Sequence, residues 1–146
     1  MRVLFLHPED SPWLGEWAGQ RWDLIIDLGF ASSQTYAEWS RRSGARILSV
    51  HEFSGQTDSY RWVDQVLERG RGRLLDHLGL DWWEIVGASF YKDIQLLHTV
   101  GQLRAEVATD GVELAATRPD PLTGLFARMQ DCAIHYFRSA SDGPFE

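Results

Sequence analysis

Residues 22–29, Trp22-Asp23-Leu24-Ile25-Ile26-Asp27-Leu28-Gly29, decide the fold of this 146-residue chain. The apolar run within them has the length and the branched side chains of a buried parallel strand, and it ends near the acid Asp27. A turn at the final glycine follows, and Ser32 or Ser33 is placed to cap a helix that runs to about residue 43. The stretch therefore predicts a strand–turn–helix unit of an α/β protein.

Three more apolar runs end on polar residues in the same way, and helical segments alternate with them. This alternation is typical of a parallel sheet with right-handed crossovers. We therefore predict a single Rossmann-like α/β domain over residues 1–138, with an open, doubly wound, mostly parallel sheet of four to five strands flanked by helices. Residues 139–146 form a polar tail. The predicted strands are residues 3–6, 24–28, 46–50, 112–116 and a short fifth strand within 132–137.

Two helical segments stand between the third and fourth predicted strands. The second begins at Asp81, which has the spacing of a capping box with Glu84, and runs to about residue 107. We expect it to bury a stripe formed by Val86, Phe90, Ile94, Leu97 and Gly101. The connection is long for a simple crossover, so helix 82–107 is a candidate surface for a second α/β domain or for self-association. Asp120-Pro121 predicts the start of a further helix, residues 121–130.

Composition excludes several classes of protein. A formal net charge of −7 argues against nucleic acid or an anionic membrane as the main partner. Cys132 is the single cysteine, so no internal disulfide forms and a reducing, cytoplasmic location is expected. The apolar run at residues 3–6 is far too short for a membrane span or a signal peptide, and we expect no membrane-spanning helix.

The polar residues at the strand ends mark the candidate site. They are His7, Asp27, His51 and Thr117-Arg118. In open α/β sheets, ligands bind beyond the carboxyl ends of the strands, where the strand order reverses. Asp27 and His7 form a reasonable acid–base pair. Strand ends must be polar somewhere, however, so ordinary solvation explains any one of these residues equally well.

Three further features each allow two interpretations. Ser32 and Ser33 can hold an anion at a helix start, although plain capping explains them more simply. Trp13 and Trp17 can stack against a sugar, or fill the core as large aromatic rings usually do. His7, Asp10, Asp27 and His51 match no metal-binding spacing, so no metal is predicted. The fingerprints of dinucleotide-binding proteins and P-loops are absent.

Three stretches together resemble the N-terminal half of a GT-B-type glycosyltransferase. They are Met1-Arg2-Val3-Leu4-Phe5-Leu6-His7-Pro8, residues 22–29 and Asp81-Trp82-Trp83-Glu84. The resemblance covers most of residues 1–117 as a pattern of elements. It implies one of two Rossmann-like domains that face each other across a cleft, the N-terminal one binding the acceptor and the C-terminal one the nucleotide sugar.

The resemblance implies an acceptor-side domain that is catalytically incomplete alone and binds a small-molecule or glycan acceptor. His7 is then the candidate base, and Asp27, Ser32 and Ser33 are acceptor contacts. Trp13 or Trp17 is then the stacking platform. No cofactor is expected in this chain, because the nucleotide sugar would bind a separate domain, and the polar tail fits the end of a fragment.

Two other functions stay open at this point. One is a non-catalytic module that binds a small anion or a nucleotide in the same crevice, with His51 and Arg118 among its ligand contacts. The other is a protein-interaction domain that uses helix 82–107. The sequence leaves undecided whether the chain is part of an enzyme.

Overall fold

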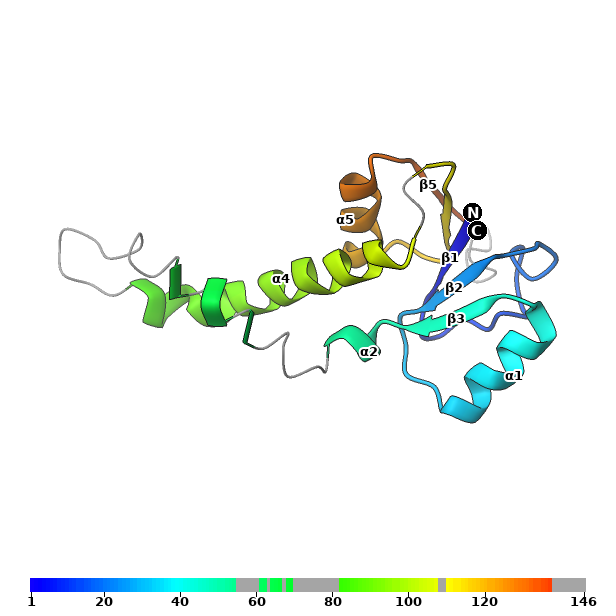
Figure 1. The fold of residues 1–146 in the computed structure, drawn as a ribbon, viewed down its shortest axis with the longest axis horizontal. Coiled ribbons are helices and arrows are strands. Elements are labelled where there is room, and N and C mark those ends of the chain that lie inside the picture. The colour runs from blue at the N-terminus through cyan, green and yellow to red at the C-terminus, as the bar shows by residue number, and fades with distance from the viewer. Residues whose placement is uncertain (55–60, 63, 67, 70–81, 108–109, 138–146) are drawn as a thin grey trace, which may run out of the picture.

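The computed structural model describes residues 1–54, 61–62, 64–66, 68–69, 82–107 and 110–137. They contain a five-stranded, all-parallel sheet in the order β3-β2-β1-β4-β5. The predicted doubly wound Rossmann-like fold is therefore confirmed (Figure 1). The strands are β1 (Arg2–Leu6), β2 (Leu24–Asp27), β3 (Arg46–Ser49), β4 (Glu113–Ala116) and β5 (Ile134–Tyr136).

The strand order places a switch point between β1 and β4. The chain moves outward from β1 to β2 and β3, and then crosses back so that β4 pairs with the other side of β1. The loops that follow β1 and β4 therefore start next to each other at the same edge of the sheet. The first then leads toward β2 and the second toward β5, on opposite sides of the switch point. A crevice between such loops is the usual ligand site of an open α/β sheet.

The helices that connect the strands are α1 (Ser33–Ser43), α2 (His51–Ser54), α4 (Trp82–Ala105) and α5 (Pro121–Gln130). Two of them begin as predicted. Ser32 caps α1 by accepting the Thr35 N–H, and Asp120 caps α5 by accepting the Leu122 N–H. Gly44 ends α1 in the left-handed region at φ 70°, where a glycine is unstrained. The short helix α2 was not predicted.

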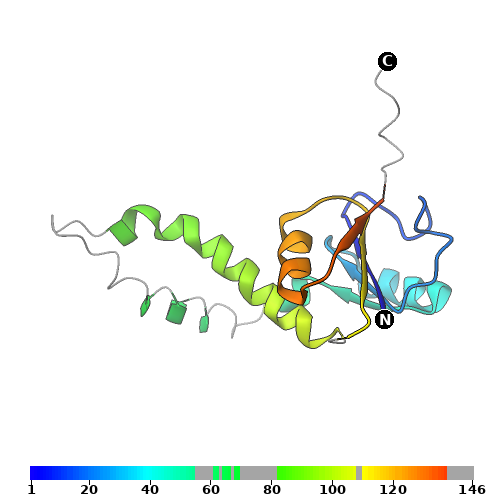
Figure 2. The same ribbon diagram turned by 90° about the horizontal axis from the view of Figure 1, so that it is seen from above.

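Successive side chains of a strand point to opposite faces, and the two faces of this sheet are both covered. Val3 and Phe5 face α4 and α5, where the Phe5 ring meets Phe126 edge-on at 5.2 Å between centroids. Leu4 and Leu6 face α1 and the loop between β1 and β2. Figures 1 and 2 show α1 on one side of the sheet and α4 with α5 on the other.

Helix α4 packs on the sheet with a different stripe from the predicted one. Leu97 is 43% exposed and Gly101 is exposed, whereas Val100 and Leu103 are fully buried. The helix is thus rotated so that the series Leu96, Val100, Leu103 and Val107 faces the core. Both series recur with helical spacing, and the crossing of α4 over the sheet selects between them. The side chains of Val86 and Phe90, and the predicted cap at Asp81, lie outside the described residues.

Helix α4 is much longer than the sheet it crosses. Its 24 residues span about 36 Å, whereas the five residues of β1 span about 17 Å. Both ribbon views show its N-terminal part reaching beyond the strands (Figures 1 and 2). Neither α4 nor any other helix in the described part of the chain has the apolar length needed to cross a membrane.

Candidate functional site

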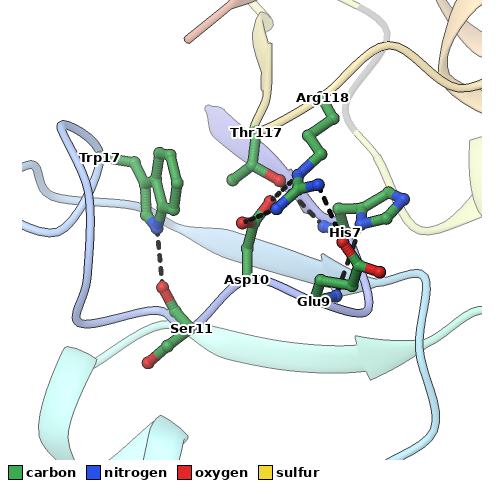
Figure 3. A network of polar contacts seen from close by, with 7 residues as sticks. All are labelled: His7, Glu9, Asp10, Ser11, Trp17, Thr117 and Arg118. Atoms are coloured by element: carbon green, nitrogen blue, oxygen red, sulfur yellow. Dashed lines mark hydrogen bonds and ion pairs between the residues drawn. The ribbon is translucent and has the colours of Figure 1, made fainter. Parts of the chain in front are cut away.

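The loops that leave β1 and β4 meet at the switch point. The backbone N–H of His7 donates to the Thr117 hydroxyl oxygen at 2.9 Å, across 110 residues of sequence. Arg118 follows directly and reaches back over the loop that carries His7 (Figure 3). The structure thus brings together His7 and Arg118, two of the residues that the sequence marks as candidates.

Arg118 joins the two loops through two carboxylates. Its Nε and one terminal nitrogen donate to both oxygens of Asp10, at 3.1 and 3.0 Å, and its other terminal nitrogen donates to Glu9 at 2.9 Å. The Asp10 side chain is only 10% exposed, whereas that of Glu9 is 71% exposed. A planar, bidentate arginine–carboxylate pair of this kind fixes geometry as well as charge.

The ionisation of Asp10 follows from these contacts. Burial opposes the charged form and raises the pKa of Asp10. Hydrogen bonds from Arg118 and Thr117, with the charges of Arg118 and His7, outweigh burial and hold that pKa below its ordinary value of 3.8. The hydrogen bond to Asp10 also raises the pKa of Arg118 above its ordinary value. Both partners are therefore charged at neutral pH.

The imidazole of His7 lies at the rim of this cluster. Its Nδ1 accepts the Glu9 N–H at 3.4 Å, which is long for a hydrogen bond. In the neutral ring this contact favours the tautomer with its proton on Nε2, an assignment that rests on the contact alone. His7 then offers a donor at Nε2. For Nε2 to act as a base, the proton of the neutral ring must lie on Nδ1 instead. That tautomer loses only the long contact between Nδ1 and the Glu9 N–H.

Asp27 ends the neighbouring strand β2, paired in register with Leu6 of β1, and it is 3% exposed. One carboxylate oxygen accepts the Gly29 N–H at 3.0 Å, and the other accepts the Tyr36 hydroxyl at 2.6 Å. The same hydroxyl accepts the Ala31 N–H at 3.0 Å. Both oxygens therefore hold the turn from β2 into α1, and a ligand reaches Asp27 only if one of these bonds opens.

The turn after Asp27 packs tightly against the His7 loop. A Cβ on Gly29 would lie 3.1 Å from the Pro8 Cα, so the close approach of the two backbones favours a glycine there. The Tyr36 hydroxyl, which donates to Asp27, is affected by the same surroundings. Burial, and then the hydrogen bond to Asp27, raise the pKa of Tyr36 above 10. The turn after β2 therefore packs beside the loop that carries His7, on the side away from β4.

Ser32, Ser33 and His51 lie at the same edge of the sheet but outside the polar cluster. The Ser32 hydroxyl is engaged as the cap of α1, accepting the Thr35 N–H at 3.2 Å. Ser33 is the exposed first residue of that helix. The His51 ring meets Phe30 edge-on at 5.8 Å, and its backbone N–H donates to the Ser49 hydroxyl.

The two tryptophans take different positions. Trp17 is 3% exposed, packs against Phe137 with centroids 5.8 Å apart, and donates its indole N–H to the Ser11 carbonyl at 2.8 Å. Of the two interpretations that the sequence allowed for Trp17, the contacts of its ring favour packing in the core. Trp13 is partly buried, and one face of its ring is covered by the Arg42 guanidinium at 4.0 Å.

An open groove of about 630 Å³ lies beside β5, away from the switch point, with Arg2, Trp22 and His135 among its lining residues. Arg2 is already engaged there by Glu113 at 2.9 Å and stacks on Trp22. We place the candidate site at the polar cluster instead, because charged and hydrogen-bonding side chains converge there at the switch point of the sheet.

Sequence reasoning missed Glu9 and Tyr36 as site residues and considered Asp10 only as a metal ligand. Glu9 and Asp10 lie within four residues of the end of β1, but nothing local indicates that they meet Arg118, 109 and 108 residues away. Tyr36 could have been found from the turn, since it lies nine residues after Asp27 on the first turn of α1. Within the described residues, no group of three or more His, Cys, Asp and Glu side chains could hold a metal ion.

In comparisons with known proteins, the chain matches no family model, no curated protein and no solved structure.

Proposed function

We propose that this chain is the acceptor-side domain of a GT-B-like glycosyltransferase and binds its acceptor between the loops after β1 and β4. The observation that supports this proposal is the polar cluster at the switch point, where His7, Glu9 and Arg118 converge. Ligands of open α/β sheets bind at such a position. The domain alone is incomplete, and transfer requires a second α/β domain.

The charges of the cluster favour a neutral ligand that carries hydroxyl groups. Arg118 is already paired with two carboxylates, so a phosphate there would have to displace one of them. The exposed carboxylate of Glu9, in contrast, can accept a hydrogen bond from a sugar hydroxyl, and bonds of this charged kind are the stronger ones. His7 is the candidate group for moving the proton of the attacking hydroxyl.

The remaining parts of the proposal concern partners and location. The nucleotide sugar binds the second domain, so this chain needs no cofactor of its own. The part of α4 that reaches beyond the sheet is the surface we assign to a second α/β domain or a second copy of the chain. We also propose a cytoplasmic location, which the presence of a single cysteine supports.

A thermal-shift screen tests this function. The panel contains neutral glycosides, nucleotide sugars and inorganic phosphate. At least one glycoside is expected to raise the melting temperature, because a ligand that binds only the folded state stabilises it by mass action. That increase should be lost in His7→Ala and Glu9→Gln. It should persist in the matched control His135→Ala, whose histidine lies beside the β5 groove.

Three results contradict the proposal. Stabilisation by nucleotide sugars or phosphate alone indicates a nucleotide-binding or anion-binding module. A glycoside effect that survives His7→Ala and Glu9→Gln places the ligand elsewhere. If no compound of the panel raises the melting temperature, the proposed acceptor function is rejected.

A further inference from the structure

We propose that the Asp10–Arg118 ion pair is a clamp that positions the loop carrying His7 and Glu9, and that both members act as positioning residues rather than ligand contacts. The inference deepens the acceptor-site proposal, on which its functional meaning rests. Its structural content can be tested without any ligand.

Residues 7–10, the first part of the loop after β1, are held at both ends. At the start, the His7 N–H donates to Thr117 at 2.9 Å. At the end, the Asp10 N–H closes a turn on the His7 carbonyl at 2.9 Å, while the Asp10 carboxylate receives two bonds from Arg118. In the described residues, Thr117 and Arg118 supply the side-chain hydrogen bonds and ion pairs that join this segment to the loop after β4. They hold residues 7–10 in addition to the pairing of β1 with β4, which ends just before them.

The two carboxylates that hold Arg118 have different exposures and therefore different roles. Asp10 is 10% exposed and bidentate, so its pair is partly shielded from water. Glu9 is 71% exposed and makes one bond, an arrangement that contributes little to stability. Glu9 can therefore leave Arg118 for a ligand hydroxyl while the loop stays in place, whereas Asp10 cannot leave without releasing the loop.

The same geometry explains why an arginine is needed at position 118. Two donors of the planar guanidinium meet the two oxygens of Asp10, and a third reaches Glu9. A lysine carries a comparable charge on a single nitrogen and cannot reproduce this fork. Arg118→Lys should therefore keep the charge but lose the clamp.

Amide hydrogen exchange, measured residue by residue by NMR on the whole chain without ligand, tests the clamp. The reporters are the amides of His7 and Asp10, which donate the two bonds that fix the loop. In Asp10→Asn and in Arg118→Lys, both amides should exchange about tenfold faster, while the amides of β1 and β2 keep their rates, because only the loop opens. The matched control is Glu9→Gln, which should change the reporters by less than about twofold.

A double-mutant cycle completes the test. If the two residues act through one contact, Asp10→Asn combined with Arg118→Lys should accelerate the reporters no more than either change alone. The inference is overturned if Asp10→Asn leaves both reporters unchanged, if core amides accelerate equally, or if Glu9→Gln has as large an effect. If Arg118→Lys does not fold, the exchange rates of the reporter amides in Asp10→Asn, compared with those in Glu9→Gln, decide the question. The exchange experiment uses no ligand, so a negative result there rejects the clamp but does not reject the acceptor site. A negative glycoside screen rejects the acceptor site but does not reject the clamp.

Discussion

Two aspartates at the same edge of the sheet show two ways of using a carboxylate. Asp27 is 3% exposed, and its partners are the neutral donors Gly29 and Tyr36, at most nine residues away. Asp10 has the charged partner Arg118, 108 residues away. The first carboxylate builds one strand–turn–helix unit, whereas the second joins two units that only the strand order brings together.

The two carboxylates therefore have different roles: Asp27 stabilises a local turn, and Asp10 positions the loop of the candidate site. The Asp27 turn depends on local sequence and should form whenever β2 and α1 form. The Asp10 clamp depends on β4 lying beside β1, and so on the completed sheet. Substitutions at Asp27 should therefore act on global stability, and substitutions at Asp10 should act first on the loop that carries His7.

The largest effect is expected at Asp27. Asp27→Ala leaves the buried Gly29 N–H and the Tyr36 hydroxyl without their acceptor, and should lower the free energy of unfolding by about 3 kcal/mol. Tyr36→Phe removes one of the two bonds and should have about half that effect. Urea unfolding followed by tryptophan fluorescence measures both. A change at Asp27 smaller than that of Asp10→Ala would contradict the assigned roles.

A moderate, pH-dependent effect is expected at Asp10. The pKa of Asp10 is lowered in the folded protein, so its ion pair stabilises the fold at pH values above 3.8, and this stabilisation is lost as the pH falls through the lowered pKa. Unfolding at pH 7 should require about 1–2 kcal/mol less in Asp10→Ala.

Acid titration of the unfolding free energy checks the sign. Asp10→Asn should show a flatter decline than the natural chain as the pH falls below 3.8, because one carboxyl group with a lowered pKa is missing. Parallel acid limbs in the two proteins would mean that Asp10 is not the group involved.

The smallest effect is expected at the start of α1. Ser32→Ala removes the capping oxygen from the Thr35 N–H and should destabilise the protein by about 1 kcal/mol. Ser33→Ala, one residue into the helix, should lie within about 0.5 kcal/mol of the natural chain. Thermal unfolding of the pair measures the difference. Equal effects would indicate that capping is not what Ser32 does.

Local patterns predicted the elements of this fold well. The apolar runs located the strands, and Ser32, Gly44 and the Asp120-Pro121 pair located helix ends, because each of these signals acts within a few residues. The parallel sheet followed from their alternation. The polar strand ends also indicated the edge of the sheet at which the polar cluster lies.

Features that depend on residues far apart in the chain could not be predicted from the sequence. The pairing of Asp10 with Arg118 depends on strand order, which no local signal encodes. The buried stripe of α4 depends on how the helix crosses the sheet, so Val100 was buried where Leu97 had been expected. Trp17 and Trp13 look alike in sequence, yet one is core and the other lies beneath Arg42.

Chemical-shift mapping tests the location of the site most directly. A ¹H–¹⁵N NMR spectrum of the chain, titrated with neutral glycosides, should show shifts gathered at residues 7–10 and 117–118, while Trp13, Arg42 and the β5 groove stay unchanged. Shifts that gather instead at the groove around Cys132 and His135, or along Trp13 and Arg42, would contradict a ligand site at the switch point.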